Sequence, residues 1–91
     1  MIRSCRDADT AEVLRGARSR KFRAIQKQAE IRLAALDSAT SLMDLALPGY
    51  RLEKLKGDRK VQYSIRINDR YRICFEWTKD GAHDVEIIDY H

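Results

Sequence analysis

Proline, glycine and cysteine are scarce in this chain of 91 residues, which has one, four and two of them. The cysteines, Cys5 and Cys74, fit neither a disulfide framework nor a zinc-ligand spacing, so we expect reduced thiols in a cytosolic protein. There is no internal repeat and no low-complexity stretch, and Pro48-Gly49 is the one clear break. Because neither side of this break is large enough to fold alone, the sequence predicts a single domain, residues 1–91.

Long apolar segments are also missing. No apolar run approaches the ~18 residues of a membrane span, and no signal-peptide pattern opens the chain. We therefore expect a cytoplasmic protein without a membrane partner. The apolar fraction of 44% is ordinary for a globular protein, and the net charge of +4 favours an anionic partner, nucleic acid before an acidic protein.

The first half of the chain is predicted to be mainly helical. Residues 1–5 are expected to form a short edge strand, followed by a short helix capped by Asp9 or Thr10. Residues 22–37 give the stronger helix, because apolar side chains recur there at spacings of three and four. They are Phe22, Ile25, Ala29, Leu33 and Leu36. Residues 42–47 then form a helical turn or two.

Basic residues gather at the start of the second helix: Arg15, Arg18, Arg20, Lys21 and Arg23. Cations at a helix N-terminus oppose the helix macrodipole, a small cost that indicates an external anion or an acidic neighbour. Three interpretations remain open: a solvated helix start, a docking surface for a partner protein, or a nucleic-acid patch.

The second half alternates apolar and polar residues, which is typical of strands. Strands are predicted over residues 50–55, 61–67, 71–77 and 83–89. Tyr63 and Phe75 fall on one face of this sheet, whereas Arg66 and Arg72 fall on the other. The pattern predicts an α+β domain with two to three N-terminal helices packed on a three- to four-stranded antiparallel sheet. The helices must cover the apolar face, and the other face is expected to stay open to solvent or ligand.

The polar residues expected on this open face suit the cleavage of a phosphodiester. They are Lys54, Lys56, Arg59, Arg66, Arg70, Arg72, Tyr90 and His91. The sequence offers no convincing Ser/His/Asp triad, no paired carboxylates, no glycine-rich phosphate loop and no metal-ligand cluster. Cations, a phenol and an imidazole instead suit cleavage by the substrate's own 2′-hydroxyl, which needs a base, an acid and charge stabilisation at phosphorus. His91 is the side chain best suited to proton transfer near neutral pH.

Each of these residues also has a purely structural interpretation. His91 could be an exposed end residue, and Arg66 and Arg72 could be solvated strand residues that pair with Glu76 or Glu86. The concentration of such groups in one half of a small basic protein is what favours the functional interpretation.

Three motifs in the second half resemble those of the HigB toxins, the plasmid-maintenance killer branch of the RelE/ParE superfamily. They are LKGDR at 55–59, YSIRINDRYRICF at 63–75 and VEIIDYH at 85–91. The resemblance covers almost the whole chain, including the MIRS start, although the helical half is less specific.

The resemblance implies a compact α+β fold of the RelE-like, microbial-ribonuclease type. It also implies a toxin of a type II toxin–antitoxin system, an endoribonuclease that cleaves mRNA in the ribosomal A site without a metal or other cofactor. A HigA-type antitoxin with a helix-turn-helix fold would neutralise the toxin, and the complex would bind operator DNA through the antitoxin.

Family active-site positions correspond to Lys56, Arg72, Asp89, Tyr90 and His91. On the same face, Lys54, Arg59, Arg66 and Arg70 are expected to bind RNA. The chain departs from the family pattern at Glu53, where some relatives carry a histidine, and at Arg70, where some carry glutamine or asparagine. Tryptophan is common where this chain has Tyr63 or Tyr71. Glu53 is therefore an alternative base.

Two other functions fit the same sequence features. The ParE branch of the superfamily inhibits DNA gyrase by binding and without catalysis, and it shares the fold. An inactive RNA- or protein-binding module is the second of these alternatives. The Lys, Arg, Tyr and His residues of the sheet favour the nuclease.

Overall fold

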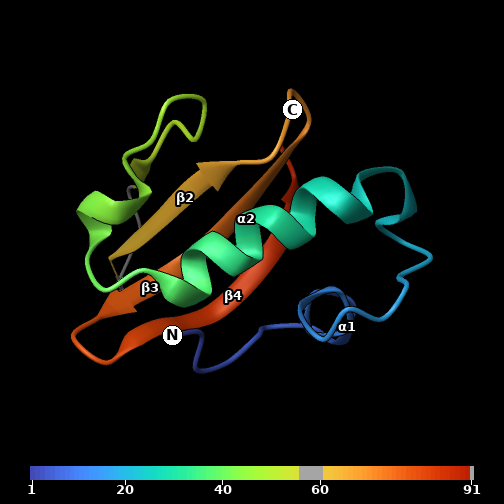
Figure 1. Cartoon of the computed structure of the whole chain (residues 1–91), viewed down its shortest axis with the longest axis horizontal. Coiled ribbons are helices and arrows are strands. Elements are labelled where there is room, and N and C mark those ends of the chain that lie inside the picture. The colour runs from blue at the N-terminus through green and yellow to red at the C-terminus, as the bar shows by residue number, and fades with distance from the viewer. Residues whose placement is uncertain (56–60, 91) are drawn as a thin grey trace.

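The computed structural model describes residues 1–55 and 61–90. In this part of the chain, two α-helices and two short 3-10 helices precede four strands (Figure 1). The elements are α1 (Ala8–Leu14), η1 (Arg23–Ile25), α2 (Gln26–Ser38), η2 (Leu42–Leu45), β1 (Glu53–Leu55), β2 (Gln62–Arg66), β3 (Tyr71–Thr78) and β4 (Gly81–Asp89). The predicted α+β class is confirmed, with four strands and two α-helices.

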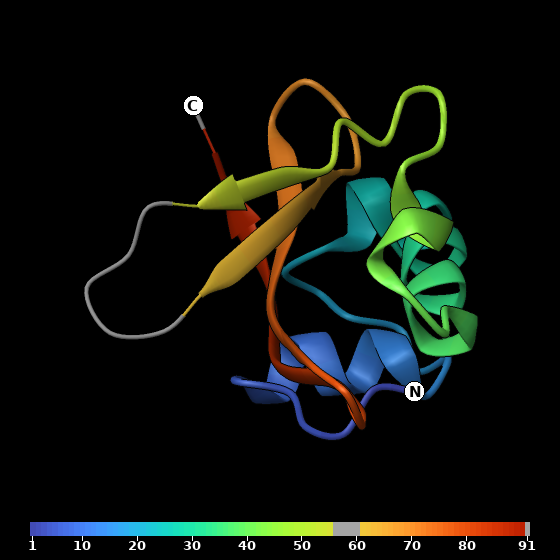
Figure 2. The same cartoon turned by 90° about the vertical axis from the view of Figure 1, so that its left-hand side faces the viewer.

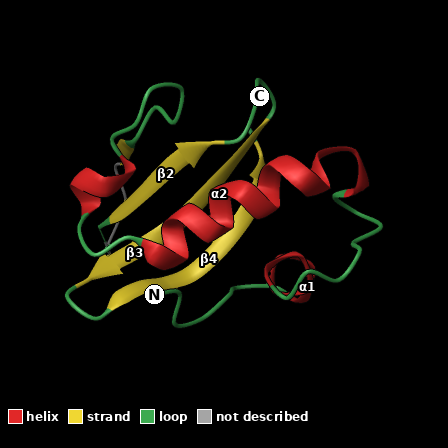
Figure 3. Ribbon diagram, in the orientation of Figure 1, coloured by secondary structure: helices red, strands yellow, loops and turns green. Residues whose placement is uncertain are grey.

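The four strands form one antiparallel sheet in the order β1-β2-β3-β4, so each strand pairs with its neighbour in the chain. Figure 3 shows α2 lying across one face of this sheet, and Figure 2 shows α2 and η2 on the same side. The register pairs Tyr63 with Phe75 and Arg66 with Arg72. Because directly paired residues share a face, the predicted division into an apolar face and an arginine-bearing face is confirmed.

The core lies between α2 and the apolar face of the sheet. Every member of the predicted helical stripe is buried: Phe22, Ile25, Ala29, Leu33 and Leu36. Arg32 of α2 is only partly exposed. Its guanidinium lies 4.1 Å from the centre of the Tyr50 ring and donates to the Arg66 carbonyl at 2.9 Å.

The first seven residues differ from the prediction in two ways. Residues 1–5 form no continuous strand; Ile2 and Cys5 make isolated parallel bridges to β4. The cap of α1 is Asp7, whose carboxylate accepts from the Thr10 backbone at 3.1 Å, rather than Asp9 or Thr10. Thr10 is fully buried, and its hydroxyl accepts from the Ile87 backbone at 3.0 Å. The Thr10 side chain, predicted as a possible helix cap, is therefore used in a tertiary hydrogen bond.

Two predicted elements are shorter than expected. The helix predicted from residue 22 begins with the 3-10 turn η1, and regular α-helix starts only at Gln26. The strand predicted over residues 50–55 is reduced to Glu53–Leu55. Arg51 has a φ of 48°, a left-handed conformation that no regular strand contains. The backbone therefore turns sharply at Arg51 before β1 begins.

Gly81 opens β4 with a φ of 131°, and a side chain at this position would overlap the carbonyl of Met1. That carbonyl accepts from the Ala82 backbone at 2.9 Å and so joins the N-terminal segment to the sheet. We expect Gly81→Ala to lower the free energy of unfolding by about 2–3 kcal/mol. Gly16 has a φ of 82° and nothing within 4 Å of an added Cβ. Gly16→Ala is therefore a control that introduces backbone strain without a steric overlap, and we expect it to lower the free energy of unfolding by about 1 kcal/mol. Equal losses in urea titrations of the two variants would contradict the overlap.

Candidate functional site

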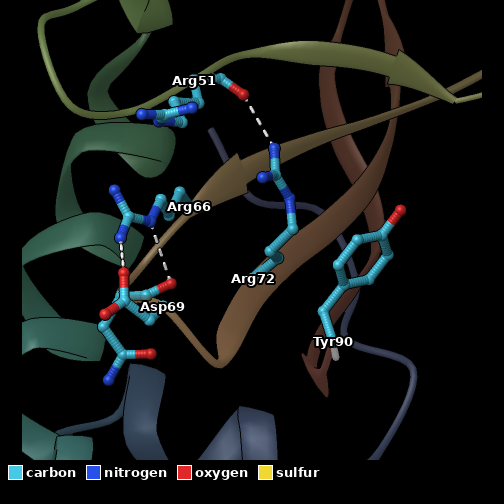
Figure 4. A pocket seen from close by; sticks show the side chains of 6 residues that line it. Arg51, Arg66, Asp69, Arg72 and Tyr90 are labelled. Atoms are coloured by element: carbon cyan, nitrogen blue, oxygen red, sulfur yellow. Dashed lines mark hydrogen bonds and ion pairs between the residues drawn. The ribbon is translucent and has the colours of Figure 1, made fainter.

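A cavity of about 300 Å³ lies on the arginine-bearing face of the sheet (Figure 4). Its lining consists of Arg51, Arg66, Asn68, Asp69, Arg72 and Tyr90. These residues come from the turn before β1, the end of β2, the β2–β3 hairpin, the start of β3 and the residue after β4. The fold therefore brings together three of the predicted site residues, Arg66, Arg72 and Tyr90.

Arg72 is the most firmly held side chain of this cavity. Its Nε donates to the Ser64 hydroxyl at 2.9 Å, and its Nη2 donates to the Arg51 carbonyl at 2.7 Å. Nη2 also lies 3.2 Å from a carboxylate oxygen of Glu53. The Tyr90 ring packs beside the guanidinium, with its centre 5.6 Å from Cζ. Such contacts fix the orientation of the planar fork that recognises phosphate.

The prediction of a fully open face is wrong at Arg72, which is only 8% exposed. The hydroxyl of Ser64 and the carbonyl of Arg51 are close enough to enclose the guanidinium, and Ser64 itself is completely buried. The structural alternative, in which Arg72 pairs with Glu76 or Glu86, is also wrong, because its carboxylate partner is Glu53. Pairing with Glu53 offsets the cost of burying the charge.

Arg66 lines the opposite wall. Its guanidinium forms an ion pair with Asp69, and its Nε donates to the Asn68 carbonyl at 3.1 Å. The Asn68 side chain in turn accepts from the backbones of Arg70 and Tyr71 at 2.9 and 2.8 Å. An asparagine that bonds the backbone two and three residues ahead explains how this hairpin forms without a glycine.

Arg51 belongs to the cavity but was not among the predicted site residues. Its backbone carbonyl holds Arg72, whereas its guanidinium makes no hydrogen bond or ion pair with any residue that the structure describes. Alternation from the buried Tyr50 would have placed Arg51 and Glu53 on the face of Arg72. The alternation of polar positions in this strand therefore indicates Arg51, whereas the apolar positions alone do not.

Three predicted site residues lie away from the cavity. Lys54 pairs with Tyr63 across β1 and β2, which places it on the opposite face from Arg72, so the predicted convergence of Lys54 with Arg72 is wrong. Asp89 and Arg70 form a bidentate ion pair with distances of 2.8–3.0 Å. The hydrogen bonds and charge of Asp89 raise the pKa of Arg70 above its usual value. Arg70 also accepts through its carbonyl from the Tyr90 backbone at 2.6 Å, so this pair holds Tyr90 at the cavity.

The predicted residues Lys56, Arg59 and His91 lie outside the described residues, so their placement in the site stays a prediction. Among the described residues, no three His, Cys, Asp or Glu side chains gather to hold a metal ion. Nor does that part of the chain contain a helix long and apolar enough to cross a membrane.

Cys74 lies two residues after Arg72 in β3, on the same face of the sheet, and is a free thiol. Burial, followed by the charge of Glu86, raises its pKa from the ordinary 9.0 to about 11, although Arg72 opposes this shift. The thiol is therefore protonated at neutral pH and does not supply a nucleophile or a base.

We expect Cys74 to react with iodoacetamide at pH 8 on the order of 100-fold more slowly in the native protein than in the unfolded chain, because thiolate is the reactive form. A Cys5→Ser background isolates this thiol. The raised pKa contributes stability below pH 9, and this contribution is lost as the pH rises from 9 towards 11. Equal native and unfolded rates would contradict the shift.

The four-stranded antiparallel sheet with its covering helix is consistent with the fold of the RelE-like toxins. Residues 13–91 match the family model described as the RelE-like toxin of the type II toxin–antitoxin system HigB. The match covers well over half of the chain, and the chain belongs to this family of HigB-like toxins.

Two curated proteins are similar to the chain. One is the protein named Endoribonuclease HigB of Proteus vulgaris, 38% identical over 60 residues, which are 66% of this chain and 65% of that protein. The other is Toxin HigB-1 of Vibrio cholerae serotype O1, 41% identical over 61 residues, which are 66% of this chain and 63% of that protein. The chain spans less than two thirds of the length of each of these relatives.

Proposed function

We propose that this protein is an endoribonuclease toxin that cleaves mRNA in the A site of the translating ribosome and so inhibits translation. The observation that carries the proposal is the fixed guanidinium of Arg72 in a cavity with two further arginines and the Tyr90 phenol. The similarity to a protein named Endoribonuclease HigB supports the same activity. The proposal treats residues 1–91 as one toxin domain with a microbial-ribonuclease-like fold.

In this proposal the arginines bind the scissile phosphate. Arg72 donates from a preorganised position to the oxygens on which charge builds, and such donors act most strongly where water is excluded. Arg51 and Arg66 extend the cationic wall towards neighbouring phosphates. Lys54, Arg59 and Arg70 are proposed to contact RNA farther from the scissile bond. Arg70 does so only at the expense of its pairing with Asp89.

Proton transfer is assigned to three of the predicted site residues. His91 and Lys56 are proposed as proton-transfer groups, and Tyr90 is proposed to orient the ribose or protonate the leaving oxygen. Glu53 is the alternative base, because its half-exposed carboxylate already lies beside Arg72. Asp89 acts indirectly, through Arg70 and the backbone of Tyr90. The reaction uses the substrate's own 2′-hydroxyl and needs no metal.

The remaining partners follow from this function. A HigA-type helix-turn-helix antitoxin is proposed to neutralise the toxin, and operator DNA is bound only through the complex. Because the substrate is mRNA on the ribosome, we propose that the protein acts in the cytoplasm.

Primer extension on mRNA from cells that express the chain tests this function. We expect new 5′ ends within coding regions within minutes of induction, and none when translation initiation on the reporter mRNA is blocked. Gyrase inhibition would instead produce a DNA-damage response with intact mRNA. Binding to ribosomes without new 5′ ends would indicate an inactive module.

A further inference from the structure

Arg32, in the middle of α2, connects the helical layer to the end of the sheet that carries the arginine cavity. Its guanidinium lies 4.1 Å from the centre of the Tyr50 ring, and its Nε donates to the Arg66 carbonyl at 2.9 Å. The residue stands three positions after Ala29 and four before Leu36, both completely buried, so it borders the stripe that packs on the sheet. From there its long side chain reaches the end of β2 and the turn before β1.

The two contacts of Arg32 meet at the backbone of Arg66. Because β1 spans only Glu53–Leu55, its ladder with β2 does not extend to Arg66. The Arg66 N–H instead donates to the Tyr50 carbonyl at 2.6 Å, and the Arg66 carbonyl accepts from Arg32. Both backbone groups are thus satisfied outside the regular sheet. Arg32, Tyr50 and the backbone of Arg66 therefore form one connected unit.

This unit holds one wall of the arginine cavity. Arg66 contributes its side chain to the lining, and so does Arg51, which follows Tyr50 in the chain. Arg51 has a left-handed backbone, a conformation that persists only where the surroundings hold it, and its carbonyl accepts from Arg72 at 2.7 Å. Arg51 and Arg66 lie on the same side of Arg72 (Figure 4). The wall on that side is therefore connected to α2 through Arg32.

The charge of Arg32 is not required for packing. The side chain is partly buried, and it makes no ion pair with a residue that the structure describes. Removing a cation from water costs free energy, and an apolar side chain would fill the same space without that cost. Arg32 does not line the cavity either. What the guanidinium adds is a fixed direction, because one planar group both packs over a ring and donates to a carbonyl.

We propose that Arg32 is a positioning residue for the cleavage reaction, which holds Arg66 and Arg51 where they meet phosphate. The inference rests on the proposed nuclease function for the identity of the reaction. Without the guanidinium, the Arg66 carbonyl loses its partner and the turn at Tyr50 loses the group packed on it. Movement of that turn also displaces the carbonyl that fixes Arg72. RNA would still enter the cavity, but the donors would no longer be preorganised for the charge that develops in the transition state.

Steady-state cleavage of mRNA on purified ribosomes tests this role. Arg32→Met keeps a long side chain without the guanidinium, and we expect kcat to fall on the order of 10- to 100-fold with KM nearly unchanged. Arg32→Lys keeps the charge without the planar group, so its kcat should lie between those of Arg32→Met and the wild type. Lys27→Met removes an exposed cation from the same helix and should leave both constants unchanged.

The Nε–H signal of Arg72 in NMR spectra reports the order of the cavity without ribosomes or RNA. This group donates to the buried Ser64 hydroxyl, so its proton should exchange slowly in the wild type and on the order of tenfold faster in Arg32→Met. The backbone N–H of Ile87, which donates to the buried Thr10 hydroxyl, is the reference for general stability and should change much less.

A selective fall in kcat together with faster exchange at Arg72 supports the proposal. It is overturned if folded Arg32→Met cleaves at the rate of Lys27→Met, or if Arg72 and Ile87 accelerate equally, which would indicate a general loss of stability. A rise in KM at unchanged kcat also overturns it, in favour of direct contact with RNA. Circular dichroism checks folding; if Arg32→Met does not fold, the same outcomes are read from Arg32→Lys. Should the wild type not cleave mRNA, the proposed nuclease fails, and the exchange measurement alone decides whether Arg32 positions the cavity.

Discussion

Arg72→Ala is expected to reduce mRNA cleavage on the ribosome by a factor of about 10²–10³, the usual cost of removing one preorganised donor to a developing oxyanion. Arg72 is fixed by Ser64 and by the Arg51 carbonyl, so its guanidinium needs no reorganisation when phosphate enters. The assay is the rate at which new 5′ ends appear on mRNA bound to purified ribosomes. Arg72→Lys keeps the charge but not the bidentate fork, so we expect an intermediate rate.

The variant also leaves polar groups without partners, and this effect must be separated from catalysis. The Ser64 hydroxyl and the Arg51 carbonyl would each lose a hydrogen bond, at a cost of about 1–3 kcal/mol in the free energy of unfolding. Urea titration measures that loss, and cleavage is then compared under conditions in which both proteins are folded. Arg6→Ala removes an exposed arginine far along the chain from the cavity and should leave cleavage unchanged. A folded Arg72→Ala protein with the wild-type rate would remove Arg72 from the mechanism.

Phe75→Ala is expected to lower the free energy of unfolding by about 3–5 kcal/mol, a large share of the total for a domain of this size. Phe75 is completely buried at the centre of β3. Its ring stacks on Tyr63 with centroids 6.2 Å apart and meets the Trp77 ring edge-on at 6.3 Å. Removing it opens a cavity between rigid aromatic neighbours, which cannot collapse into the space.

The unfolding midpoint in urea, at unchanged slope, measures this loss. Met43 is 77% exposed, so Met43→Ala is the control for truncating a large apolar side chain and should change stability by less than about 0.5 kcal/mol. A Phe75→Ala protein as stable as this control would contradict the assignment of Phe75 to the core. Because Phe75 and Arg72 lie on opposite faces of β3, the variant should lose cleavage activity only at temperatures at which it unfolds.

Periodicity was enough to predict the elements and the faces that they bury. Spacings of three and four residues predicted the buried stripe of α2, and alternation separated Phe75 from Arg72. These signals are reliable because a side chain's direction follows from backbone geometry, which repeats along each element. The exceptions occurred where the backbone stops repeating, as in the left-handed turn at Arg51.

The sequence predicted that Arg66, Arg72 and Tyr90 share one face, and they line one cavity, but it could not tell which cations are already paired within the protein. Arg70 is paired with Asp89, and Lys54 pairs with Tyr63 on the face opposite Arg72. Arg51 enters the cavity from the left-handed turn that precedes β1.

The sequence by itself therefore determined the α+β class, the buried stripe and the arginine-bearing face of this HigB-like toxin, because each depends on local periodicity. Only the tertiary structure decided that Arg72 is enclosed by Ser64, the Arg51 carbonyl and Glu53. It alone also decided that the ion pair of Arg70 with Asp89 holds the residue after β4, Tyr90, at the cavity. Both depend on contacts between residues distant in the chain, whose distances are set by how the layers pack and by the turns between them.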